Sequence, residues 1–137
     1  MKNKYYTPTK EEFHIGFEYE VKDYLDDQDK TMIDWIPFTI MDGEEIQDMI
    51  DETKHDSERF RVKYLDKDDI EDLGFIPSTN EKHLYYLGDV SLQLHNNNCL
   101  TIRYNNKFNN EWRTAVEFIV IKNKSELKVL LKQLNIL

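Results

Sequence analysis

The sequence predicts an α+β domain with a mostly antiparallel sheet and helices on one face. Three observations lead to this fold class. Strand-like alternation outnumbers helical periodicity, hairpin turns join the longest β-rich stretch, and the last residues form an amphipathic helix. The chain has 137 residues and shows no internal repeat or flexible linker, so we expect a single domain over residues 1–137.

The first elements are a short helix and two strands. Thr9 and Glu12 have capping-box spacing, which predicts a helix start. Residues 14–22 alternate apolar and polar side chains, the pattern of a half-buried strand. Residues 32–40 are apolar and β-prone, but Pro37 cannot donate a hydrogen bond to a sheet. We therefore expect the second strand to be an edge strand or a bulged one.

A helix and a third strand follow. Asp42 is expected to cap a helix in which Ile46, Met49 and Ile50 recur on one face. Residues 59–64 then alternate basic and apolar side chains, which predicts a strand with a basic outer face. We expect this basic face to pair with acidic side chains of a neighbouring element.

The next stretch predicts a second short helix and a hairpin. Asp66 is expected to cap one or two helical turns, and Gly74 to end them in a left-handed conformation. Residues 90–94 and 100–104 alternate apolar and polar side chains on either side of Asn96–Asn98. Because asparagine tolerates left-handed conformations, this segment is expected to form the turn.

The chain closes with a strand and a helix. Asn123 and Glu126 have capping-box spacing, and leucines recur at i, i+3, i+4 and i+7 from Leu127, which predicts an amphipathic helix. Before it, one face of a last strand is expected to carry Trp112, Thr114, Val116, Phe118 and Val120.

Charge is the most uneven property of the chain. The net charge is −9, and residues 1–76 hold 22 Asp or Glu against 10 Lys or Arg, whereas residues 77–137 hold 5 against 8. A negative field repels nucleic-acid backbone, so direct nucleic-acid binding is disfavoured, and it attracts a basic protein partner. The chain shows neither a signal peptide nor a membrane-spanning run, and its one cysteine, Cys99, suits a reducing compartment, so we expect a cytoplasmic protein.

The sequence carries no motif of a known chemistry. Its four glycines are far apart, which excludes a glycine-rich phosphate loop, and a Gly-x-Ser-x-Gly nucleophile elbow is absent. The polar face of the first strand holds His14, Glu18 and Glu20, residue types that bind divalent metals. The interpretation we prefer is a solvated face paired with Arg61 or Lys63, and we expect no metal and no cofactor.

A second candidate lies at the predicted hairpin. His95, beside Asn96 and Asp89, has the chemistry of a general base, and Cys99 across the turn suggests a thiol dyad. Because neither a positioned serine nor a second histidine accompanies them, we interpret these residues as polar residues that flank a turn. The sequence thus favours a protein that is not an enzyme.

The carboxylates of the N-terminal half are the candidate binding residues. Gathered on one surface, they would steer a basic protein into contact, whereas spread out they would only keep the chain soluble. The candidates are Asp23, Asp26, Asp27, Asp29, Asp42, Glu44, Glu45, Asp48, Asp51 and Glu52.

Three stretches, residues 5–20, 61–75 and 121–134, together carry a family resemblance. Their clearest parts are Tyr5-Tyr6-Thr7-Pro8-Thr9, Arg61-Val62-Lys63-Tyr64-Leu65 and Asn123-Lys124-Ser125-Glu126-Leu127. The set resembles uncharacterised small proteins of Bacteroidetes bacteriophages, including crAss-like phages, and of their hosts. The resemblance brings no catalytic motif. It implies a phage-encoded protein that binds a host or phage protein in the bacterial cytoplasm.

Two alternatives stay open at this point. One is a structural or packaged virion component that assembles through the sheet edge near Pro37. The other is a small-molecule or metal-binding enzyme of unknown reaction, with its pocket near His14, Glu18 and Glu20.

Overall fold

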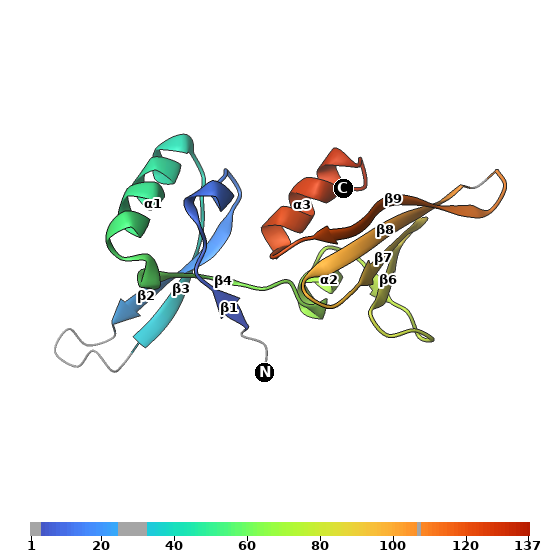
Figure 1. Cartoon of the computed structure of the whole chain (residues 1–137), viewed down its shortest axis with the longest axis horizontal. Helices are drawn as coiled ribbons and strands as arrows, with labels where there is room; N and C mark the ends of the chain where they lie inside the picture. Colours follow the sequence, from blue (N-terminus) through green and yellow to red (C-terminus); the bar gives the residue numbers. More distant parts are fainter. Residues whose placement is uncertain (1–3, 25–32, 107) are drawn as a thin grey trace. The chain divides into compact units, whose positions relative to one another are not determined.

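A computed structural model of the chain describes residues 4–24, 33–106 and 108–137. The chain divides into two compact units, Met1–Tyr64 and Leu65–Leu137 (Figure 1). Each unit has its own hydrophobic core. The described residues form two antiparallel sheets and three α-helices, so the predicted α+β fold is confirmed. Whether the two units together form the single domain predicted from the sequence is not tested by this division, so the single domain stays a prediction.

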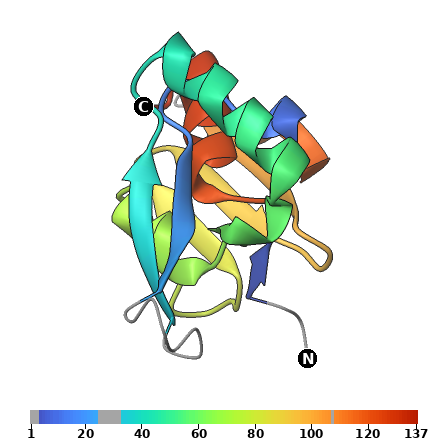
Figure 2. The same ribbon diagram turned by 90° about the vertical axis from the view of Figure 1, so that its left-hand side faces the viewer.

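The first unit is a four-stranded sheet in the order β1-β4-β2-β3, with one α-helix packed on it (Figure 2). Its elements are β1 (Tyr5–Tyr6), the 3-10 helix η1 (Lys10–Glu12), β2 (Glu18–Tyr24), β3 (Ile33–Thr39), α1 (Gly43–His55), the 3-10 helix η2 (Ser57–Arg59) and β4 (Phe60–Lys63). The core between helix and sheet is made by Phe13, Phe17, Ile40, Met49, Phe60 and Val62.

The sequence placed the start of the first long strand too early. A turn occupies its predicted first residues, because the Phe17 N–H donates to the His14 carbonyl (3.0 Å) and Gly16 takes a φ of +92°. The strand therefore begins at Glu18. The short helix predicted at Thr9 is a single 3-10 turn, held by a 2.7 Å hydrogen bond from the Thr9 N–H to the Glu12 carboxylate.

The edge position predicted for the strand with Pro37 is confirmed. Strand β3 lies at the end of its sheet and pairs with β2, with Pro37 opposite Glu20. A missing N–H disturbs a sheet least at an edge, where one row of backbone groups has no strand to bond.

The second unit is a five-stranded antiparallel sheet in the order β5-β6-β7-β8-β9. Two helices pack on one face of it, with Ile70, Leu127 and Leu131 against Tyr85, Leu92 and Ile102 of the sheet. The elements are α2 (Lys67–Asp72), β5 (Ile76–Pro77), β6 (Leu84–Leu87), β7 (Val90–Leu94), β8 (Cys99–Asn106), β9 (Glu111–Val120) and α3 (Lys124–Gln133).

The predicted caps and turns of this unit are confirmed. Asp66 accepts from the Asp69 N–H at the start of α2, and Gly74 follows the helix with a φ of +102°. Asn97 and Asn98 turn between β7 and β8, each with a φ of +60°. Asn123 accepts from the Glu126 N–H (2.9 Å) and caps the predicted C-terminal helix.

The prediction of one continuous face along the last strand is wrong. Leu100 pairs with Ile119 but Ile102 pairs with Val116, so a step of two residues in β8 matches a step of three in β9. A second irregularity follows this β-bulge, because Ile102 pairs with Val116 but Arg103 pairs with Thr114. Together these irregularities break the alternation. Val116 and Ile119 pack on the core, whereas Phe118 is 61% exposed with a φ of +51°. In the part of the chain that the structure describes, no helix is long and apolar enough to cross a membrane.

Candidate protein-interaction surface

Helix α1 presents the candidate surface, and its first turn is fixed by the sequence around it. The Asp42 carboxylate accepts from the Glu45 N–H (2.9 Å), and the Glu45 carboxylate accepts from the Met41 N–H (2.6 Å). The first bond satisfies a backbone donor of the first helical turn, and the second ties the residue before the N-cap to that turn. Met49 is buried, with Ile46 partly buried beside it, so the opposite side of α1 faces solvent.

Three carboxylates lie along that solvent side. Glu44, Asp48 and Asp51 are spaced i, i+4, i+7 and are exposed, so they follow one side of the helix. We call these three residues the α1 acidic stripe. None of them forms an ion pair with a Lys or Arg of the described residues, although Gln47 donates to the Asp51 carboxylate (3.2 Å). The stripe is thus available to a cationic group from outside the chain.

The other predicted carboxylates have different places. Asp42 and Glu45 serve the helix start, and Glu52 approaches the Arg59 guanidinium at 3.9 Å. Asp23 lies on β2, opposite Asp34 of β3, and both are exposed. The predicted residues Asp26, Asp27 and Asp29 lie outside the described part of the chain. The structure therefore brings together three of the ten candidates on one helix side.

Asp34 is an acidic residue that sequence reasoning missed. Like charges directly opposite each other in an antiparallel pair repel, so the Asp23–Asp34 pair costs some stability. The pairing follows from the register of β2 and β3, and alternation alone does not give the register.

The carboxylates of α1 make their neighbourhood electronegative. Burial raises the pKa of the half-buried Tyr19 phenol, and the charges of Glu45 and Glu52 raise this pKa further. In the second unit the pKa of Tyr85 is raised first by burial and then by Glu71, Asp66 and Asp68. The carboxylates of α1 therefore act on Tyr19 in the first unit, and those at and near α2 act on Tyr85 in the second.

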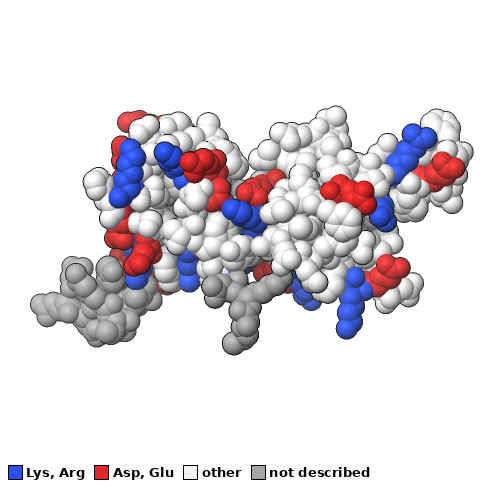
Figure 3. All heavy atoms as spheres, viewed as in Figure 1, with Lys and Arg blue, Asp and Glu red and all other residues white. Residues whose placement is uncertain are grey.

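The charge division follows the units. Residues 1–64 hold 17 Asp or Glu and 9 Lys or Arg, a balance of −8, whereas residues 65–137 hold 10 and 9, a balance of −1. The sequence split at residue 76 exaggerated the contrast, because five acids between residues 66 and 72 belong to the second unit. Figure 3 shows acidic side chains over both units, with Lys and Arg interspersed among them on the face in view.

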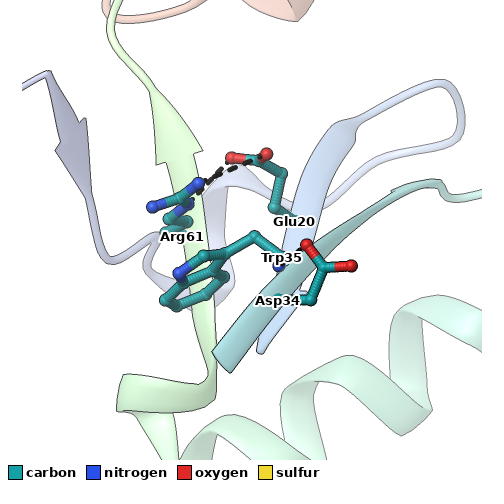
Figure 4. Close-up of polar contacts among 4 residues, drawn as sticks. All are labelled: Glu20, Asp34, Trp35 and Arg61. Atoms are coloured by element: carbon teal, nitrogen blue, oxygen red, sulfur yellow. Dashed lines mark hydrogen bonds and ion pairs between the residues drawn. The ribbon is translucent and has the colours of Figure 1, made fainter. Parts of the chain in front are cut away.

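The weak metal candidate is not assembled. His14 precedes the strand and its Nδ1 hydrogen bonds the Ile15 carbonyl (2.9 Å), while Glu20 is paired with Arg61 (Nε to Oε2, 2.8 Å; Figure 4). Glu18 lies at the start of β2. Among the residues that the structure describes, no three His, Cys, Asp or Glu side chains are grouped to hold a metal ion. The predicted pairing of the basic strand with a neighbouring acid is confirmed at Arg61.

Arg61 is also held by two aromatic rings. Its guanidinium lies 3.6 Å from the Tyr5 ring centroid and 4.1 Å from that of Trp35. Tyr5, Arg61 and Trp35 come from three different strands, so this stacked arrangement depends on the sheet order and was not readable from the sequence. The guanidinium and the Glu20 carboxylate are each about a quarter exposed, which makes this pair part of the architecture of the unit.

The His95 and Cys99 side chains have partners other than each other. His95 Nε2 lies 2.8 Å from the Thr101 hydroxyl, and the Cys99 thiol donates toward the Asn97 carbonyl (3.7 Å). Asn96 belongs to the turn after β7, and Asp89 lies in the separate turn between β6 and β7. Thr101 itself is buried, so this contact ties the His95 ring to the interior of the sheet.

The described geometry thus leaves the α1 acidic stripe as the candidate functional surface. No family model, curated protein or solved structure matches the chain.

Proposed function

We propose that this chain is a small acidic interaction protein, encoded by a bacteriophage, that binds a basic host or phage protein in the bacterial cytoplasm. The α1 acidic stripe is the contact surface. The single observation that supports this proposal is the exposed run of Glu44, Asp48 and Asp51, none of which is neutralised by a described Lys or Arg. The family resemblance supports the phage setting.

The physical basis of the contact is electrostatic steering. From residue 44 to residue 51 a helix rises about 10 Å, so the three carboxylates match cationic side chains spread over a similar length. A field of this kind raises the association rate and selects against acidic partners. Salt screens such a contact, because the Debye length falls from about 10 Å at ~0.1 M to about 3 Å at ~1 M ionic strength.

Charge reversal along the stripe tests the proposal. The stripe variant carries Glu44→Lys, Asp48→Lys and Asp51→Lys, and the matched control carries Glu11→Lys, Glu58→Lys and Glu81→Lys. Both change the net charge from −9 to −3, but the control changes exposed acids outside α1. In pull-downs from a bacterial lysate at low salt, we expect the wild type and the control to retain a partner that the stripe variant loses.

Two further measurements keep the result interpretable. Lysine in the first turn opposes the helix dipole, so the variant Glu44→Gln, Asp48→Asn, Asp51→Asn removes the charges without that effect. Circular dichroism of each variant checks that α1 still folds. Equal loss in the stripe variant and the control, or a partner retained at ~1 M salt, would contradict docking through the stripe.

Assembly through the sheet edge, as a virion component, is the second candidate. Ile36 and Phe38 of edge strand β3 are partly exposed, which favours contact there. Pro37 between them disfavours it, because a proline interrupts the row of backbone donors that a further strand would need. Mass spectrometry of purified phage particles separates the two functions. The enzyme alternative is not proposed, because Glu20 is engaged by Arg61 and His14 lies outside the strand.

A further inference from the structure

The second unit has a sheet face to which the strand register assigns no carboxylate, although the exposed Glu117 precedes Phe118 in the bulged part of β9. Helices α2 and α3 pack on one face, and the strand register places a set of side chains on the other, which we call the open face. None of the positions that the register assigns to it holds Asp or Glu, although this unit contains ten acids. The positions are Ile76, Leu84, Tyr86, Ser91, Gln93, Cys99, Thr101, Arg103, Asn105, Trp112, Thr114 and Val120.

Exposed aromatic rings lie on this face. The Tyr86 and Trp112 ring centroids are 6.3 Å apart, although the residues come from β6 and β9. Trp112 is 46% exposed and Tyr86 37%. Rings this accessible offer flat apolar surface that the core of the unit does not use.

A second ring pair depends on the β-bulge of β9. The Phe118 ring centroid lies 4.6 Å from that of His95, and the Phe118 N–H donates to the Thr101 hydroxyl (3.2 Å), which also hydrogen bonds His95. A φ of +51° is unfavourable for a bulky side chain. Phe118 thus has a strained backbone conformation, which the hydrogen bond to the buried Thr101 hydroxyl stabilises, while its aromatic ring stays exposed.

We propose that the open face binds single-stranded nucleic acid. Unpaired bases would stack on the Tyr86–Trp112 pair and on Phe118, and Arg103, which lies in the same cross-strand row as Tyr86, would contact a phosphate. Stacking on aromatic side chains beside a cation is how proteins bind single strands without reading their sequence. This site is separate from the α1 acidic stripe and goes beyond the proposed function.

The net charge of −9 does not decide against this site. The unfavourable field comes mainly from residues 1–64, at −8, whereas the second unit is at −1. The acids of α2 belong to a helix that packs on the opposite face of the sheet. Arg103 is therefore available to an anion, and the other positions that the register assigns to the open face are neutral, with Glu117 beside Phe118 as the nearby acid of β9.

Fluorescence anisotropy with labelled oligonucleotides of about 12 nucleotides tests this proposal, a length within the range of about 4–16 nucleotides that single-strand sites span on OB folds. We expect the full chain to bind oligo-dT and oligo-rU at low salt, and unlabelled duplex to compete poorly. Stacking is worth about 1–3 kcal/mol per base, so Tyr86→Leu with Trp112→Leu should weaken binding about tenfold or more. Arg103→Gln should lower the slope of log affinity against log salt by about 0.7.

Phe108→Leu is the matched control, since Phe108 is fully exposed in the turn between β8 and β9 and outside the open face. It should bind like the wild type. A preference of the wild type for oligo-dT or for oligo-rU identifies the nucleic acid. No anisotropy change up to about 10⁻⁴ M protein, the weak end of non-specific affinity, overturns the proposal. Equal oligonucleotide binding by the wild type and the Tyr86/Trp112 variant also overturns it. A third contrary result is a wild type that self-associates but binds no oligonucleotide, with self-association lost in the variant, which would assign the face to protein contact.

Discussion

Replacing Phe17 with alanine is expected to lower the free energy of unfolding of the first unit by about 3–5 kcal/mol. Phe17 is fully buried, and its ring meets that of Phe13 edge to face with centroids 5.6 Å apart. The turn at Gly16 delivers this side chain into the core between α1 and the sheet. Alanine leaves a cavity that the surrounding side chains fill only in part, so transfer and packing energy are both lost.

Chemical denaturation measures this effect. The fluorescence of Trp35 reports on the first unit when Trp112, the other tryptophan, is replaced by phenylalanine in all variants. The matched control is Ile15→Ala, two residues earlier, where the side chain is 63% exposed and a change within about 0.5 kcal/mol is expected. A loss below about 1 kcal/mol for Phe17→Ala would show that this core is not packed as described.

The second large effect is expected at Arg61. Arg61→Ala should destabilise the first unit by about 2–3 kcal/mol, because it removes a charged hydrogen bond and two cation–π contacts and leaves Glu20 without its partner. Arg61→Lys should recover only part of this loss. A lysine keeps the charge but lacks the planar group that lies against the rings of Tyr5 and Trp35.

Arg59 offers the control of the same residue type. Its guanidinium is 3.9 Å from Glu52 and both side chains are about half exposed, so Arg59→Ala should cost at most about 0.5 kcal/mol. Urea titrations of the three variants give the comparison. Equal effects of Arg61→Ala and Arg59→Ala would mean that the stacked arrangement contributes no stability.

Local chemistry made much of the fold predictable. Asp42 and Asn123 were identified as helix caps because an acceptor side chain precedes an apolar period at each position. The β7–β8 hairpin was predicted from Asn97 and its neighbours, which take the left-handed conformations that asparagine tolerates. Each of these features depends on residues within a few positions of each other.

Long-range arrangement limited the remaining predictions. The division into two cores was missed because no glycine- or proline-rich linker marks the boundary at Tyr64. The pairing of Asp23 with Asp34 and the position of Arg61 depend on strand order and register. The bulge at Phe118 was missed because the sequence alternates regularly there, and the Thr101 hydroxyl that holds it lies on another strand.

Helical spacing, and not residue type, identifies which carboxylates lie together on the candidate surface. Ten carboxylates were candidates by type, but the three on the solvent side of α1 are those at i, i+4 and i+7. Asp42 and Glu45 belong to the cap, a role that capping spacing already indicates. Their charges therefore stabilise the helix that presents the stripe.

Site-specific photo-crosslinking tests the docking surface most directly. A photoreactive amino acid in place of Gln47 lies beside the α1 acidic stripe and leaves its three carboxylates intact, and one in place of the exposed Thr79 of the second unit is the comparison. On irradiation in a bacterial lysate at low salt, we predict an adduct with a basic protein from position 47 that is absent from position 79 and disappears at high salt. An adduct from position 79 alone, or the same adduct from both positions, would contradict docking through α1.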